Sequence, residues 1–149
     1  MIRKHRKNIK SVIIGDSKKS FQLGGGAPLM LIAGPCVVED HGLCLEIAAE
    51  AKRVTAKHNI SYVFKASFDK ANKTIAGSYR GPSIDVGLDA LAKIKGESDS
   101  FLITDVHEPE QCRRTADIAD ILQIPALLSK QIDLILAAGK TGKAVNIKK

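Results

Sequence analysis

Residues 62–73 read Tyr62-Val63-Phe64-Lys65-Ala66-Ser67-Phe68-Asp69-Lys70-Ala71-Asn72-Lys73. Here an apolar strand runs directly into lysines, a serine, an aspartate and an asparagine. Side chains on a strand alternate between its two faces, so Val63, Lys65 and Ser67 share one face. Burial of that face would bury the Lys65 ammonium, which is costly unless an anion meets it. The stretch therefore predicts a core strand that ends at the site of a phosphate or carboxylate ligand.

Apolar runs and helical patterns alternate along the rest of the chain. Strands are predicted at residues 29–33, 62–64, 101–104, 118–123 and 144–147, and helices at about 41–57, 84–95, 108–116 and 129–139. Leu43, Ile47, Ala51 and Val54 recur at three- to four-residue spacing, which predicts one apolar stripe along the first helix. Regular alternation of apolar strands and helices is typical of parallel strands joined by crossover helices.

The polar residues at the strand ends decide between an open sheet and a barrel. Alternation places the following groups on one face, at the ends of successive strands: Cys36, Lys65 and Ser67, Asp105 and His107, Gln123, and Asn146 and Lys148. An active face at the carboxyl ends of many strands is typical of a (β/α)8 barrel, whereas an open sheet uses mainly its switch point. No Gly-x-Gly-x-x-Gly follows a strand, so a Rossmann fold is disfavoured. We expect an α/β fold that comprises about the first five β/α units of a (β/α)8 TIM barrel.

The sequence predicts two parts. Residues 1–28 are expected to form a basic arm and a β-hairpin, with short strands at 9–14 and 20–23 around a Gly15-Asp16-Ser17 turn. Residues 29–149 are expected to form the N-terminal portion of the barrel. Because a complete barrel takes about 250 residues, we expect the C-terminal part to be absent and this chain to be inactive alone.

The positive charge is concentrated at the start of the chain. Residues 1–20 hold seven Lys and Arg against one acidic residue, which gives +6 of the total of +7 and leaves +1 for the other 129 residues. No aromatic residues are interleaved with these basic ones, so we expect a solvated arm and no nucleic-acid partner. No apolar run reaches the roughly 20 residues of a membrane helix. Three cysteines without a pairing motif, and no signal peptide, predict a cytoplasmic protein.

Lysines at strand ends are the candidate anion-binding residues. Lys65, Lys70, Lys73 and Lys148 could each bind phosphate as a point charge. The alternative, a solvated loop lysine, fits Lys73 best and fits Lys65 and Lys148 least, because these two end apolar strands.

Two other strand ends carry side chains for which the sequence leaves more than one role open. Asp105 and His107 could reach one substrate atom, with histidine passing protons or binding metal, or Asp105 could instead cap the helix expected near Glu108. Cys36 could be a metal ligand or a nucleophile. On the residues alone, however, a small buried hydrophobic side chain is favoured for Cys36.

Five segments, at residues 65–72, 78–82, 103–109, 123–126 and 146–149, resemble the 3-deoxy-D-manno-octulosonate 8-phosphate synthases, also called 2-dehydro-3-deoxyphosphooctonate aldolases. The resemblance covers about residues 15–149. It implies a (β/α)8 barrel whose floor is closed by an N-terminal hairpin, usually in a homotetramer. Such enzymes condense phosphoenolpyruvate with D-arabinose 5-phosphate and release phosphate, in a step of lipopolysaccharide biosynthesis.

The resemblance also implies roles for individual residues. Those of the phosphoenolpyruvate cradle would be Lys65, Lys70, Gln123, Ala126 and Lys148. Those that hold the sugar phosphate would be Ser67, Asn72, Lys73 and Thr74. Asp105 and His107 would line the reacting centre. The family commonly has Arg-Ser where this chain has Lys73-Thr74, and lysine keeps the charge but lacks the bidentate fork of arginine.

Cys36 matches the position that separates the two classes of this family, because metal-dependent members have cysteine there and metal-independent members asparagine. The resemblance thus implies a divalent metal in the full-length enzyme. Its histidine, glutamate and aspartate ligands would come from later strands, so no metal is expected for this chain alone. Two alternatives remain: a related synthase that uses another aldehyde, erythrose 4-phosphate or an N-acetylated amino sugar, and an inactive half-barrel that binds only anions or a partner.

Overall fold

The computed structural model describes residues 10–70, 77 and 80–149. Strands β1 (Val12–Gly15) and β2 (Ser20–Leu23) form an antiparallel hairpin. A separate parallel sheet contains β3 (Met30–Val37), β4 (Ser61–Ser67), β5 (Phe101–Asp105), β6 (Ile121–Ile124) and β7 (Ala144–Ile147). The helices are α1 (His41–Lys57), α2 (Ile84–Ser98), α3 (Pro109–Ala116) and α4 (Ile132–Lys140), with a short 3-10 helix η2 (Ala126–Leu128).

The spatial order of the parallel strands is their order in the sequence, β3-β4-β5-β6-β7. Each strand pairs in parallel with the next one. Consecutive β/α units arranged in this way are those of a (β/α)8 barrel, whereas a doubly wound sheet reverses its order at a switch point. The predicted α/β fold, a partial TIM-barrel-like unit with a separate hairpin, is therefore confirmed. The division of the chain at residue 28 stays a prediction.

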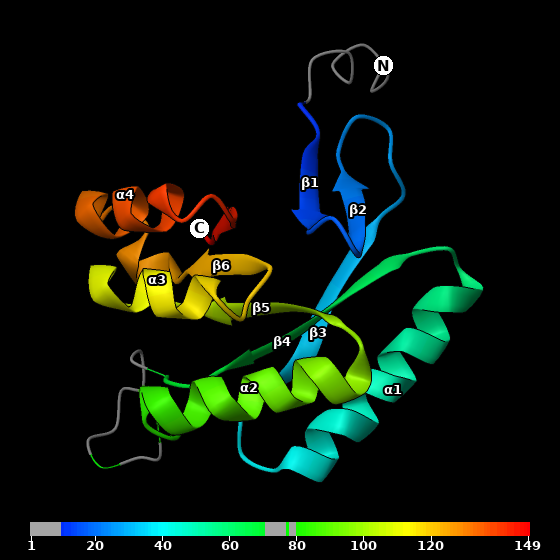
Figure 1. The fold of residues 1–149 in the computed structure, drawn as a ribbon, viewed down its shortest axis with the longest axis horizontal. Coiled ribbons are helices and arrows are strands. Elements are labelled where there is room, and N and C mark those ends of the chain that lie inside the picture. Colours follow the sequence, from blue (N-terminus) through cyan, green and yellow to red (C-terminus); the bar gives the residue numbers. More distant parts are fainter. Residues whose placement is uncertain (1–9, 71–76, 78–79) are drawn as a thin grey trace.

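The helices cover one face of the sheet and form the larger core with it (Figure 1). Alternate strand residues contribute large apolar side chains to this face. Its buried members include Tyr62, Phe64, Phe68, Leu102, Val106, Leu122 and Ile124 from the strands and their ends, and Cys44, Ala48, Leu88, Leu91 and Leu134 from the helices.

The hairpin covers the opposite face. Ile14 of β1 forms a second buried cluster with Val63, Ile103 and Ile121, which come one each from β4, β5 and β6. These three strand residues lie on the face that alternation assigned to Lys65, Asp105 and Gln123 two positions later. The inner face is therefore apolar beneath the hairpin and turns polar toward the carboxyl ends of the strands.

The buried face of α1 differs from the predicted one. Leu43 and Val54 are 50% and 40% exposed, while Cys44, Ala48 and Thr55 are buried. The prediction of a stripe through Leu43 and Val54 was wrong by one position around the helix. The residues that α1 buries are small, and small side chains let a helix pack closely against a sheet.

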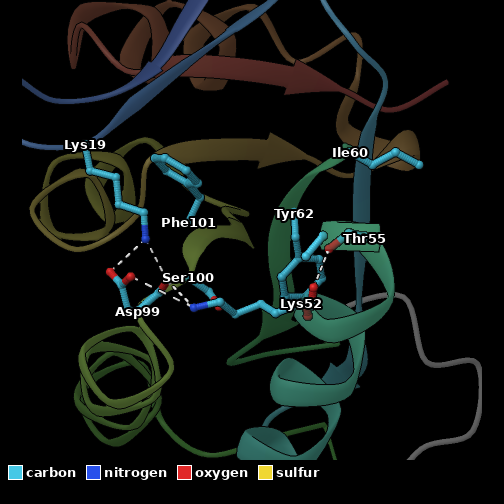
Figure 2. A pocket seen from close by; sticks show the side chains of 9 residues that line it. Lys19, Lys52, Thr55, Ile60, Tyr62, Asp99, Ser100 and Phe101 are labelled. Carbon is cyan, nitrogen blue, oxygen red and sulfur yellow. Dashed lines mark hydrogen bonds and ion pairs between the residues drawn. The ribbon is translucent and has the colours of Figure 1, made fainter. Parts of the chain in front are cut away.

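Lys19 of the hairpin turn and Lys52 of α1 both contact the carboxyl end of α2 (Figure 2). Lys19, in the hairpin turn, donates to the Asp99 backbone oxygen (2.6 Å) and to Asp99 Oδ1 (2.7 Å), with its Nζ 5.1 Å from the centroid of the Phe101 ring. Lys52 of α1 donates to the Ser98 and Asp99 backbone oxygens (2.7 and 3.0 Å) at the carboxyl end of α2. The residues of these contacts line part of a cavity of about 220 Å³. Both lysines already donate hydrogen bonds to protein oxygens, so we assign these contacts a structural role.

Among the described residues, no helix combines the length and the apolar character that crossing a membrane requires.

Close packing of α2 against β4 generates a test of the fold. A Cβ at Gly87 would overlap the Cβ of Phe68, whereas a Cβ at Gly96 on the same helix would meet no atom within 4 Å. We therefore expect Gly87→Ala to destabilise the protein by about 1–3 kcal/mol and Gly96→Ala to stabilise it by about 0.5–1 kcal/mol through helix propensity. Urea unfolding of both variants is the measurement. A Gly87→Ala variant as stable as Gly96→Ala would contradict this packing.

Candidate functional site

The polar side chains predicted at the strand ends meet on the inner face. In the sheet register, Asp105 of β5 lies beside Gln123 of β6, which lies beside Asn146 of β7. Lys65 of β4 pairs with Ile103, two residues before Asp105, so Ser67 lies level with Asp105. The parallel strands and their register thus bring side chains from four strands to one edge of the sheet.

The Asp105 carboxylate is the centre of this group. Ser67 Oγ donates to Asp105 Oδ2 (2.5 Å), and Gln123 Nε2 donates to Asp105 Oδ1 (2.5 Å). Asp105 is only 5% exposed. The alternative that Asp105 caps the next helix is wrong, because the residue at the N-cap of α3 is Glu108.

Two lysine ammonium groups lie against the same carboxylate. Lys65 Nζ is 3.3 Å from Asp105 Oδ1, and Lys70 Nζ is 3.3 Å from Asp105 Oδ2. Lys70 Nζ also donates to Ser67 Oγ (2.9 Å). The side chains of Lys65 and Lys70 are 17% and 13% exposed. Two cations share one carboxylate, so these three residues carry a net charge of +1 and favour a further anion.

Burial and charge pull the pKa values of this cluster in opposite directions. Burial alone would raise the pKa of Asp105, but the positive charge of Lys65, the Ser67 hydroxyl and Lys70 together hold it below its usual value. Burial lowers the pKa of Lys65, and the Asp105 carboxylate offsets only part of that shift. The lysine predicted to need an anionic ligand therefore already has a partner within the protein, although one carboxylate does not balance two lysines.

A second ion pair, between Asp69 and Arg80, lies next to Lys70. Arg80 donates to both carboxylate oxygens of Asp69, from Nε (2.9 Å) and from an Nη atom (2.6 Å). The Lys70 backbone N–H donates to the Arg80 carbonyl oxygen (2.7 Å). A Cβ at Gly81 would overlap the Phe68 carbonyl oxygen, so only glycine allows this approach. Together these contacts hold Lys70 beside Asp105.

His107 follows β5 and packs edge-on against Phe68, with ring centroids 6.1 Å apart. Its backbone N–H donates to Gln111 Oε1 (2.9 Å). Burial lowers the pKa of His107, which favours the neutral ring near pH 7. Its buried Nδ1 has no hydrogen-bond partner within the described part of the chain. No hydrogen bond joins His107 to Asp105 among the described residues, and its role in a reacting centre stays a prediction.

Cys36 lies at an irregular point of β3. The pairing with β4 shifts between Ala33 and Cys36, and Cys36 has a positive φ of 75°. A Cβ at Gly34 would overlap the Lys65 carbonyl oxygen, so close backbone approach accompanies the irregularity. Cys36 is exposed. The interpretation of Cys36 as a small buried hydrophobic side chain was therefore wrong.

Of the ligands that the resemblance implies for a divalent metal, the described residues supply Cys36 alone, so the metal stays a prediction. Within the described ranges, no group of three or more His, Cys, Asp or Glu side chains is placed to hold an ion. One thiolate alone does not make a metal site, since zinc in proteins takes three or four protein ligands.

Of the other predicted residues, two are exposed and three lie outside the described residues. Ala126 begins η2 and is exposed. Lys148 follows β7 and is exposed, and its backbone N–H donates to the Ile124 carbonyl oxygen (3.0 Å). Asn72, Lys73 and Thr74 lie outside the described residues. Their assignment to substrate stays a prediction.

Two interactions at the site were not assigned from the sequence. Asn146 Nδ2 donates to Gln123 Oε1 (2.8 Å). Strand alternation placed Asn146 on the correct face, but it gave this residue no role. The pairing of Asp69 with Arg80 had no sequence signal, because the two residues are 11 positions apart and neither lies in a predicted helix or strand.

Comparisons with known proteins agree with this geometry. The model of the DAHP synthetase I family matches residues 11–149. A 2-dehydro-3-deoxyphosphooctonate aldolase of Fusobacterium nucleatum is 53% identical over 142 residues, 93% of this chain and 51% of the relative. Proteins of the same name from Desulfatibacillum aliphaticivorans and Rickettsia felis are 49% and 48% identical over 130 residues, 87% of this chain and 48% and 47% of the relatives. The chain spans about half the length of these curated relatives, and the resemblance drawn from the sequence is confirmed.

Removing the shared carboxylate tests the charge balance of the cluster. We expect Asp105→Asn to destabilise the protein at pH 7 by about 3–5 kcal/mol, because two partly buried ammonium groups lose their counter-ion. The loss should shrink by pH 9.5. The folded-state pKa of Lys65 lies below its ordinary 10.5 and falls further without Asp105. Between the folded and unfolded pKa values the unfolded chain binds the extra proton, so stability rises with pH.

Urea unfolding of the wild type and D105N at both pH values is the measurement. Asp85→Asn is the matched control, because Asp85 forms an exposed pair with Arg114 and such pairs contribute little. An equal loss for D105N at pH 7 and pH 9.5 would contradict this assignment of charges.

The three cysteines should react differently with a thiol reagent. Cys36 is exposed, whereas Cys44 and Cys112 are 1% exposed and burial raises the pKa of both thiols. Because the thiolate is the reactive form, we expect a single fast phase with a colorimetric disulfide reagent, and we expect Cys36→Ser to remove it. A fast phase that persists in C36S would show that the placement of the cysteines is wrong.

Proposed function

Because the chain belongs to the DAHP synthetase I family, we propose that it carries the phosphoenolpyruvate-binding part of a synthase that condenses phosphoenolpyruvate with D-arabinose 5-phosphate to 3-deoxy-D-manno-octulosonate 8-phosphate. The observation that carries the proposal is the pair of lysines that shares one carboxylate at the carboxyl ends of parallel strands. The names of the relatives, 2-dehydro-3-deoxyphosphooctonate aldolases, support the product over others of the family.

In this proposal, Lys65 and Lys70 bind the anionic groups of phosphoenolpyruvate. The enol carbon attacks the sugar aldehyde carbon and forms the new carbon–carbon bond. The aldehyde π bond breaks as that bond forms, and its oxygen takes up a proton. Water then adds to the resulting cationic carbon and loses a proton, and the bond from this carbon to the phosphate oxygen breaks as the remaining hydroxyl loses its proton and becomes the ketone. Fixed cations contribute by holding the two reactants so that their carbons meet, an orientation effect worth several kcal/mol.

His107 has features that suit proton transfer in this reaction. Its burial favours the neutral ring, and its Nδ1 is buried without a partner in the described part of the chain. A neutral ring nitrogen can accept a proton near pH 7. We assign to His107 the role of accepting the proton that water loses when it adds.

Lys148 and Ala126 complete the phosphoenolpyruvate cradle, and Cys36 contributes one ligand to a divalent metal for which the remaining ligands are not among the described residues. The complete enzyme is a homotetramer. The three free cysteines support a cytoplasmic location.

Phosphoenolpyruvate binding tests the proposal on the chain itself. We expect the wild type to bind phosphoenolpyruvate in isothermal titration calorimetry. Lys65→Met and Lys70→Met should each weaken binding by at least about tenfold, because each removes a charge-assisted contact. Lys93→Met is the control, since Lys93 is exposed on α2. No binding by the wild type, or equal losses in all three variants, would contradict the proposal.

The same titration distinguishes the aldehydes. Repeated in saturating phosphoenolpyruvate, it should show binding of D-arabinose 5-phosphate in preference to erythrose 4-phosphate and to an N-acetylated amino sugar. A preference for either of the other two would assign the chain to a related synthase of the same family.

A further inference from the structure

Asn146 lies two strands away from Asp105, and two hydrogen bonds in series join the residues. Asn146 Nδ2 donates to Gln123 Oε1 (2.8 Å), and Gln123 Nε2 donates to Asp105 Oδ1 (2.5 Å). We propose that Asn146 is a positioning residue that holds the Gln123 side-chain amide with its NH2 group toward Asp105. The consequence of this for anion binding rests on the function proposed above.

The chemistry of the amide explains why a second residue is needed. A glutamine side chain has a donor end and an acceptor end of similar shape, so it fits the same space in two orientations. With Nε2 toward Asp105, Gln123 donates to the carboxylate. In the reversed orientation its oxygen would face a carboxylate oxygen, and two acceptors would repel each other. The donor of Asn146 favours the first orientation, because it meets the oxygen that this orientation directs toward β7.

Because the Gln123 side chain is buried, a wrong orientation of its amide costs free energy. Gln123 is 6% exposed, so water does not readily replace a lost partner, and an unpaired buried amide oxygen is costly. Asn146 is partly buried on the neighbouring strand and lies directly beside Gln123 in the register. The register therefore sets both the position of the donor and its distance from the oxygen.

The orientation of Gln123 determines how Asp105 meets the lysines. Gln123 occupies Oδ1 and Ser67 occupies Oδ2, which fixes the plane of the carboxylate. With the carboxylate so held, Lys65 Nζ lies 3.3 Å from Oδ1 and Lys70 Nζ lies 3.3 Å from Oδ2, both longer than a tight ion pair of about 2.8 Å. A carboxylate released by Gln123 would turn toward one lysine and pair with it more tightly. Less positive charge would then remain for an incoming anion.

Two variants of similar size separate positioning from packing. Asn146→Leu keeps the branched shape and removes the donor. Asn146→Asp replaces the donor with an acceptor, which should reverse the Gln123 amide. Asn59→Asp is the control, because Asn59 follows α1 on an exposed turn with φ 53°, which aspartate tolerates, and it receives the same change of charge.

The measurement has two parts. The chemical shifts of the Gln123 side-chain NH2 group are recorded by NMR on the free proteins, and phosphoenolpyruvate affinity is then measured by calorimetry. We expect both Asn146 variants to shift the Gln123 signals. Asn146→Leu should weaken phosphoenolpyruvate binding by about three- to tenfold, the effect of one net hydrogen bond. Asn146→Asp should weaken it more, and Asn59→Asp should change neither quantity.

Each outcome decides between the two proposals. Unchanged Gln123 signals in N146D would overturn the inference even if N146L fails to fold, and shifted signals with unchanged phosphoenolpyruvate affinity would overturn its link to binding. A wild type that binds no phosphoenolpyruvate would overturn the proposed function instead. The positioning of Gln123 is still decided in that case, because the signals are measured without ligand.

Discussion

Two lysine ammonium groups held beside one buried carboxylate are the constraint on which the site depends. Lys65 and Lys70 are mostly buried, and Asp105 is their shared counter-ion. Buried charges persist only when they are paired and hydrogen-bonded, and here Ser67 and Gln123 complete the environment of the carboxylate. The unequal number of charges leaves one positive charge, which suits the binding of an anion rather than a purely structural ion pair.

The fold creates this constraint by dividing the inner face of the sheet into two halves. Beneath the hairpin, Val63, Ile103 and Ile121 pack against Ile14. Two residues later on the same strands, that face carries Lys65, Asp105 and Gln123. The apolar half borders the cluster along these strands, and Arg80, paired with Asp69, accepts a hydrogen bond from the Lys70 backbone N–H. A neighbouring strand supplies Asn146, so the parallel order of the strands is what assembles the network.

Much of this arrangement could be predicted from the sequence, because it follows from alternation and from the order of the elements. The strand–helix sequence and the shared face of Lys65, Ser67, Asp105 and Gln123 are of this kind. The features that were missed depend on packing or on contacts between distant residues. The buried face of α1 depends on which side of the helix packs against the sheet. The exposure of Cys36 accompanies an irregular strand pairing, and the ion pair of Asp69 with Arg80 joins residues 11 positions apart. The sequence also indicated an external anion for Lys65, whereas part of that role belongs to Asp105 within the chain.

The central proposal is that Asp105 stays in place while Lys65 and Lys70, with their one excess positive charge, bind the anionic groups of phosphoenolpyruvate. A crystal structure of the chain with bound phosphoenolpyruvate tests it most directly. The account predicts an anionic group of the ligand within hydrogen-bond distance of Lys65 Nζ and Lys70 Nζ, with Asp105 still accepting from Ser67 and Gln123. A ligand bound elsewhere, or an Asp105 side chain displaced from both partners, would contradict the account.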